Sequence, residues 1–189
     1  NADARYKQYK NALQGQRLPA AWLDLDLLDR NCAAISQRAG GRAVRVVSKS
    51  IRSRAVLNYL LDRQPNFKGV MCYHPAEAAW LASEGMDDLL VAYPSVCTSS
   101  ITAICQQVAL GKTIYLMIDC AEQARIINEV ALRHQVVVPL CLDVDMSVDF
   151  PGLYFGVYRS PIRSAEDARS VYRNISSLAN VSLQAVMGY

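Results

Sequence analysis

One lysine stands where an amine could do covalent chemistry. In AVRVVSKSIRSRAV, residues 43–56, an apolar run becomes polar at Lys49. An amine beside an apolar interior is poorly solvated, so we expect a lowered pKa and a nucleophilic Lys49, able to form Schiff bases with carbonyl compounds. The chain has five lysines, and Lys68 and Lys112 precede their apolar runs. The alternative is an ordinary loop lysine without a chemical role.

Two arginines could meet an anionic group. Arg45 lies four residues before Lys49, so in a strand both side chains and that of Val47 share one face. Arg45 could neutralise an acid near a bound ligand, or form a structural ion pair with Asp24 or Asp143. Arg159, in GVYRSPIRS, could clamp a carboxylate or phosphate, since guanidinium binds both bidentately. A solvated loop arginine is the alternative.

The remaining candidates also follow apolar runs. His74 could touch a ring or substrate, or it could cap the helix that starts at Pro75. Tyr189 could pack or hydrogen-bond near a phosphate, and Tyr93 is a candidate of the same kind. Three aspartates could line a barrel interior, and without a histidine beside them they make a poor metal site: Asp119, Asp143 and Asp145.

The elements that must position these side chains are short strands. Seven apolar runs, most of them rich in Val, Ile, Leu and Tyr, span residues 20–25, 43–48, 68–73, 88–93, 113–119, 136–145 and 181–187. They lack period-two alternation, which is typical of strands buried on both faces of a parallel sheet. Amphipathic helical segments separate them, the first with Asp26 as its expected N-cap.

Alternating strands and helices predict an α/β fold built from βαβ units, and this number of units favours a (β/α)8 TIM barrel. An open doubly wound sheet is the alternative, but no GxGxxG follows a strand. We expect a helical N-terminal extension over 1–17 and the barrel domain over 18–189. A full barrel needs about 250 residues, so the barrel is expected to be truncated at about seven strands, with its C-terminal part beyond Tyr189.

Composition excludes several classes of protein. The chain is 52% hydrophobic and 20% charged with a net charge of +3, which is globular and argues against a nucleic-acid partner. No apolar run approaches the ~18–20 residues of a membrane span, and no signal peptide is visible. Six cysteines, none in a CxxC pair, favour a reducing, cytoplasmic location over a disulfide scaffold or a zinc site.

The segment PAAWLDLDLLDRNCAAIS, followed by RVVSKSIRS, resembles the alanine racemase N-terminal-domain superfamily, the fold-type III pyridoxal phosphate enzymes. The branch it is most similar to contains the D-threonine aldolases and D-serine dehydratases. Their motif R-P-H-x-K-T-H-K aligns with Arg45 and Lys49, whereas Val46, Val47 and Ile51 replace its proline and histidines. GVMCYHPAEAAWLASEGMDDLLVAYP, LCLDVDMS with FGVYRSP, and LQAVMGY resemble later family segments, with VDFPGLY as an interruption.

The resemblance implies pyridoxal 5'-phosphate as the cofactor. Lys49 would hold it as a Schiff base and act as acid and base, Arg45, His74 and Tyr189 would contact the cofactor, and Arg159 would contact the substrate. The substrate would be a small amino acid of L or D configuration, and the reaction that of a lyase, deaminase, aldolase or racemase. Metal ligands and a β-domain would lie beyond Tyr189, and the full-length protein would be a homodimer.

Two other functions stay open at this point. Single-domain barrels of the same superfamily bind pyridoxal phosphate in vitamin B6 homeostasis without known turnover. A cofactor-free aldolase could instead use the Lys49 amine directly.

Overall fold

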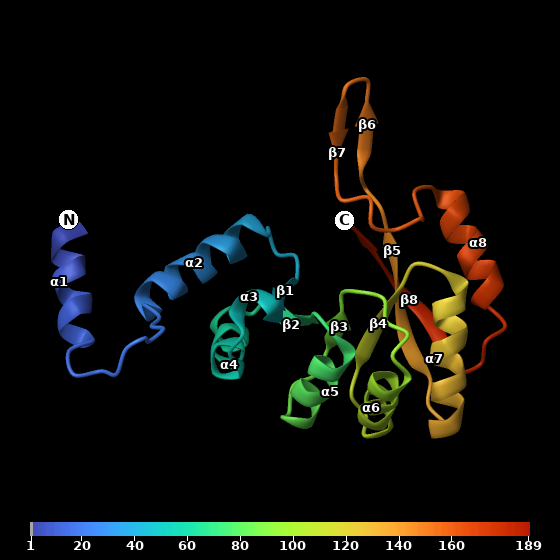
Figure 1. The fold of residues 1–189 in the computed structure, drawn as a ribbon, viewed down its shortest axis with the longest axis horizontal. Helices are drawn as coiled ribbons and strands as arrows, with labels where there is room; N and C mark the ends of the chain where they lie inside the picture. The colour runs from blue at the N-terminus through green and yellow to red at the C-terminus, as the bar shows by residue number, and fades with distance from the viewer. Residues whose placement is uncertain (1) are drawn as a thin grey trace.

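The computed structural model describes residues 2–189, and its centre is one parallel sheet. Six strands lie in the order β1-β2-β3-β4-β5-β8 (Figure 1). They are β1 (Val44–Val47), β2 (Phe67–Cys72), β3 (Leu89–Val91), β4 (Ile114–Ile118), β5 (Val138–Val144) and β8 (Val181–Gly188). Each neighbouring pair is parallel, and the strands adjoin in chain order. This α/β sheet is consistent with part of a βα barrel, and the predicted fold class is confirmed.

Helices connect the strands. They are α1 (Ala2–Ala12), α2 (Leu25–Arg38), α3 (Ser48–Ile51), α4 (Arg54–Arg63), α5 (Pro75–Ser83), α6 (Thr98–Ala109), α7 (Ala121–His134) and α8 (Ala165–Ile175). Figure 1 shows α5, α6 and α7 along one side of the sheet and α1 well apart from it. The expected N-terminal helix is therefore present as α1. No helix among residues 2–189 is both long and apolar enough to cross a membrane.

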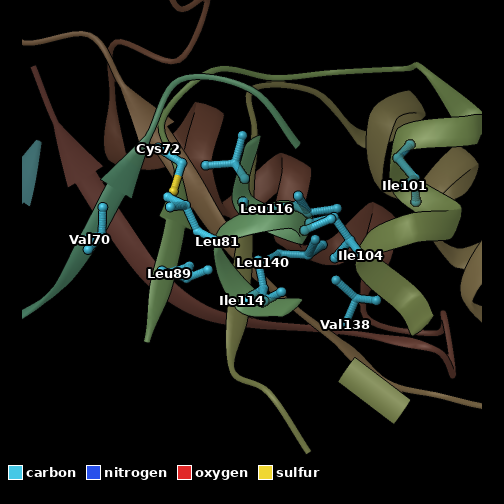
Figure 2. Close-up of a cluster of buried hydrophobic side chains, with 14 of the residues drawn as sticks. Val70, Cys72, Leu81, Leu89, Ile101, Ile104, Ile114, Leu116, Val138 and Leu140 are labelled. Atoms are coloured by element: carbon cyan, nitrogen blue, oxygen red, sulfur yellow. The ribbon is translucent and has the colours of Figure 1, made fainter. Parts of the chain in front are cut away.

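The core lies between the sheet and these helices (Figure 2). Leu81 of α5 and Ile101 and Ile104 of α6 are almost completely buried, and they belong to the same hydrophobic cluster as Ile114 of β4 and Leu140 of β5. The first six residues of β5 are all buried. Continuous burial is the pattern expected of a strand covered on both faces, so the interpretation of the apolar run over 136–145 is confirmed.

Local sequence signals explain most helix boundaries. Pro75 occupies the first turn of α5, where its missing N–H costs no hydrogen bond. Gly85 and Gly111 follow α5 and α6 with φ of +99° and +88°, a region that glycine enters without a steric penalty. Ser164 begins α8 with a capping box that Asp167 completes. The helix expected to start at Pro75 is therefore confirmed as α5.

The predicted strand over 20–25 is wrong. Residues 20–24 have no regular structure and pair with no strand in the described part of the chain, so no ladder holds them extended. Asp24 is the N-cap of α2 and accepts a hydrogen bond from the Leu27 N–H at 3.0 Å. Asp26, the expected N-cap, lies inside the first turn. The parallel sheet consequently has six strands in place of about seven.

A hairpin interrupts the connection between β5 and α8. Its strands β6 (Val148–Phe150) and β7 (Leu153–Phe155) pair antiparallel, and the hairpin projects away from the sheet (Figure 1). All of its strand residues are exposed, with Tyr154 at 77% and Phe155 at 73%. The sequence marked VDFPGLY as an interruption but did not predict strands there.

Candidate active site

The backbone around Lys49 is held firmly. β1 ends at Val47 and α3 begins at Ser48, whose buried hydroxyl donates to the Met71 carbonyl at 3.2 Å. Arg52 closes α3 in the left-handed region with φ +53°, and its Nε donates to the Lys49 carbonyl at 2.9 Å. Lys49 therefore sits at the carboxyl end of a strand, where active sites of βα barrels lie.

The Lys49 side chain is exposed, and its Nζ donates to the Tyr93 hydroxyl at 3.1 Å. This hydrogen bond raises the pKa of Lys49, and the Coulombic interaction with Tyr93 adds to it. Desolvation acts in the opposite direction but is the smaller effect. The predicted lowering of the Lys49 pKa is wrong because the side chain leaves the apolar interior and finds a hydrogen-bond acceptor.

Tyr93 is the centre of the cluster. Besides Lys49, its ring meets Tyr73 edge-on at 5.1 Å between centroids and an interplanar angle of 62°. The Arg159 guanidinium carbon lies 5.0 Å from the Tyr93 centroid and 4.6 Å from that of Tyr189. The hydrogen bond from Lys49 lowers the pKa of Tyr93, and Arg159 contributes to the lowering.

Arg159 is fixed by a buried carboxylate. Its Nε and Nη2 donate to the two oxygens of Asp143 at 2.8 and 3.1 Å, and the Asp143 side chain is only 1% exposed. These hydrogen bonds raise the pKa of Arg159. Asp143 takes the Nε–H and one Nη2–H, and the guanidinium also acts on Tyr93, whose pKa it lowers.

These side chains surround a cavity of about 230 Å³ at the carboxyl ends of the strands. Its walls are largely apolar or aromatic, and its lining is Val47, Lys49, Met71, Cys72, Tyr73, Ala92, Tyr93, Arg159, Met187 and Tyr189. A second opening of about 530 Å³ adjoins it and shares Lys49 and Tyr73. The volume of the first cavity alone is below the ~300–1,000 Å³ typical of small-molecule sites. Lys49 borders both spaces, so a ligand at its amine could extend from the cavity into the second opening.

His74 lies at the second opening, with Arg52 and Glu77. Its Nδ1 accepts a hydrogen bond from the Ala76 N–H at 3.1 Å, so it is the N-cap of α5. His74 therefore caps α5, which is one of the two roles expected for it. The same side chain also borders the opening beside Lys49.

Arg45 lies elsewhere. Its Nη2 forms an ion pair with Asp88 at 2.7 Å, and Nη1 donates to the Asp88 carbonyl. The expected partners Asp24 and Asp143 are wrong. Each is engaged by other groups, and Arg45 instead reaches Asp88, which directly precedes β3 and accepts from the Val70 N–H of β2 at 3.1 Å. Gly69 leaves space for this ion pair, because a Cβ atom at position 69 would lie 2.2 Å from the Asp88 carbonyl oxygen. Arg45 does not line the cavity.

The expected common face of Arg45, Val47 and Lys49 is therefore only partly correct. Val47 and Lys49 both line the cavity, but β1 stops at Val47 and the alternation of a strand does not continue into α3.

The other acids serve local structure. Asp119 accepts from the Gln123 amide at 2.7 Å, and Asp145 Oδ1 accepts from the Ser147 N–H at 2.7 Å. Within residues 2–189, no group of three or more His, Cys, Asp or Glu side chains is arranged to hold a metal ion.

Cys97, exposed at the N-cap of α6, is the most acidic thiol with a perturbed pKa. Hydrogen bonds with Ser100 and then Ser99 lower its pKa to about 7. The buried cysteines behave in the opposite way, because burial raises the pKa of Cys72 to about 12.

Sequence reasoning underestimated Tyr93 and missed Tyr73 and the orienting role of Asp143. A tyrosine at the end of an apolar run was the one available signal. Asp143 precedes Arg159 by sixteen residues across the hairpin, so nothing in the local pattern joined them.

The residues present fit pyridoxal phosphate. The cofactor carries an aldehyde on a flat aromatic ring, and the site offers the Lys49 amine to the aldehyde and aromatic walls to the ring.

Comparison with known proteins gives one family match. The profile of the family described as "Alanine racemase, N-terminal domain" matches residues 23–189. No curated protein matches the sequence.

Several solved structures are similar. D-threonine aldolase from Filomicrobium marinum has a TM-score of 0.75 at 19% identity, over 90% of this chain and 43% of that one. D-threo-3-hydroxyaspartate dehydratase from Delftia sp. HT23 has 0.74 at 22%, over 93% and 44%. An alanine racemase of Clostridium difficile 630 has 0.64 at 13%, over 85% and 39%. The chain spans less than half the length of these proteins, and at such identities the likeness establishes the shared fold.

Proposed function

Because the chain belongs to the family of the alanine racemase N-terminal domain, as its sequence predicted, we propose that it is the barrel part of a pyridoxal phosphate-dependent enzyme acting on a small amino acid. The observation that carries the proposal is the position of Lys49, whose amine lines a cavity at the carboxyl ends of the parallel strands. That amine would condense with the cofactor aldehyde.

Each surrounding residue would have a defined task. Bound pyridoxal phosphate supplies an electron sink for the carbanion that forms when a bond to the amino acid Cα breaks. Arg159, held by Asp143, would bind an anionic group, which we assign to the substrate carboxylate. Tyr189 and His74 would contact the cofactor from the two openings. Arg45 would not contact the cofactor itself, because its guanidinium is paired with Asp88. It would instead help to hold β1, and so Lys49, in position.

The reaction type stays within the range of the similar proteins, which are named an aldolase, a dehydratase and a racemase. We propose a lyase, deaminase, aldolase or racemase reaction, with D-amino acids as the first substrates to screen. A metal requirement is part of that screen.

The decisive experiment is trapping of the cofactor on Lys49. The full-length protein is incubated with pyridoxal phosphate and reduced with borohydride, and the modified peptide is identified by mass spectrometry. We expect a visible absorption band and a modification on Lys49, both lost in Lys49→Ala. Lys112→Ala is the matched control, because its Nζ donates to the Gly85 carbonyl, outside the cavity.

Three results would overturn the proposal or redirect it. Labelling spread over several lysines, or unchanged in Lys49→Ala, would contradict a specific cofactor site. Trapping of a carbonyl substrate on Lys49 without any cofactor would favour the cofactor-free aldolase. Cofactor bound without turnover of any amino acid would favour a vitamin B6 carrier.

We further propose that the full-length protein is a cytoplasmic homodimer. Six free cysteines support a reducing compartment. The hairpin β6–β7 supports an interface, because its large apolar side chains are exposed and such patches mark association sites. Neither a membrane nor nucleic acid is proposed as a partner.

A further inference from the structure

The Lys49 ammonium has a single hydrogen-bond acceptor in the described part of the chain, the Tyr93 hydroxyl at 3.1 Å. An ammonium has no lone pair, so Lys49 must lose a proton before its nitrogen can attack a carbonyl carbon. The nearest oxygen that can take this proton is that of Tyr93. The same atom could return it when the nitrogen is released.

The Tyr93 ring is held in place from several sides. Tyr73 meets it edge-on, and Arg159 lies 5.0 Å from its centroid. The position of Arg159 is fixed because both carboxylate oxygens of the buried Asp143 accept hydrogen bonds from its guanidinium. The phenol oxygen is thereby kept at hydrogen-bond distance from Lys49 while both residues line the cavity.

The charges that face Tyr93 act on it in one direction. Lys49 and Arg159 are the cations that face it, and both lower the pKa of Tyr93. Tyr73 and Tyr189 are the other titratable groups nearby, and each has only a weak raising effect on the pKa of Lys49. The negative charge of Asp143 is neutralised by its two hydrogen bonds from Arg159.

We propose that Tyr93 is a catalytic residue that exchanges a proton with Lys49. In the step, the N–H bond of the Lys49 ammonium breaks and an O–H bond forms on the Tyr93 phenolate, with the electron pair of the broken bond left on nitrogen. The ammonium becomes an amine and the phenolate a phenol, so charge and atoms balance without a co-reactant. Attack of the Lys49 amine on the cofactor aldehyde rests on the function proposed above. The proton exchange between Lys49 and Tyr93 does not.

The test measures each partner's titration while the other is changed. Tyrosine labelled with ¹³C at Cζ gives one resonance per residue, and the resonance absent from Tyr93→Phe identifies Tyr93. We expect it to titrate at lower pH than an unperturbed tyrosine, and to move to higher pH in Lys49→Met, which keeps the aliphatic chain and removes the charge. Reductive methylation of Lys49 by formaldehyde and cyanoborohydride, followed by peptide mass spectrometry across pH, reports the neutral amine.

Tyr93→Phe should shift the methylation profile of Lys49 to lower pH, because the hydrogen bond that holds its proton is lost. Tyr73→Phe is the matched control, since this phenol lines the same cavity without bonding to Lys49, and its shift should be much smaller. Because two coupled groups must shift each other, a Tyr93 resonance unmoved by Lys49→Met, or a Lys49 profile equal in both tyrosine variants, would overturn the proposal.

Neither measurement uses pyridoxal phosphate. A shifted Lys49 profile without cofactor trapping would support the proton exchange and refute the proposed function. Cofactor trapping on Lys49 with an unshifted profile would support the proposed function and refute the proton exchange. Circular dichroism of each variant confirms that the fold is intact.

Discussion

Replacing Asp143 by asparagine tests whether the buried carboxylate holds Arg159. Asp143 accepts two hydrogen bonds from the guanidinium, and its side chain is 1% exposed while that of Arg159 is 22% exposed. An asparagine fits the space but keeps one acceptor oxygen, so one bond and the charge attraction are lost. Hydrogen bonds to charged groups contribute about 1.5–3 kcal/mol each, which is the expected loss in the free energy of unfolding.

For a chain of this size each kcal/mol corresponds to about 2–4 °C, so Asp143→Asn should lower the Tm by about 3–12 °C. Thermal unfolding followed by circular dichroism measures the change. Glu122→Gln is the matched control, since this carboxylate pairs with Arg125 at 3.0 Å on an exposed helix face. Such pairs contribute ~0–1 kcal/mol, and its Tm should barely change. Equal melting of Asp143→Asn and wild type, or an equal loss in both variants, would refute the reasoning.

Three further predictions test other parts of the structure. Gly69→Ala should destabilise the chain by more than Gly41→Ala in urea unfolding. Both glycines have positive φ, but only at Gly69 would the new methyl meet a neighbouring ion pair, whereas nothing lies within 4 Å at Gly41. Iodoacetamide should label Cys97 before the buried cysteines; with a pKa of about 7 its rate should fall as pH drops below that value, as peptide mass spectrometry would reveal. Phe155→Ser should convert the proposed dimer to monomer in sedimentation of the full-length protein, while Leu132→Ser, exposed on α7, should not; a dimer retained by both would exclude the hairpin as an interface.

Periodicity was sufficient for most of the fold. Six of the predicted strands exist, and they are visible without a structure as short apolar runs. The reason is clearest for β5, which is buried on both faces and must be apolar throughout. The start of α5 was equally visible, since Pro75 acts through its own backbone preference. The run over 20–25 failed because an apolar composition does not supply the neighbouring strand that a ladder requires.

The sequence by itself determined that a lysine follows a strand of a parallel sheet, and hence the end of the sheet at which it lies. It did not determine the protonation of that lysine, because the partner Tyr93 is forty-four residues away. Nor did it pair Arg45 with Asp88 or Arg159 with Asp143. Hydrophobic periodicity is a local property of the chain, whereas hydrogen bonds and ion pairs depend on distances that exist only once the strands lie side by side.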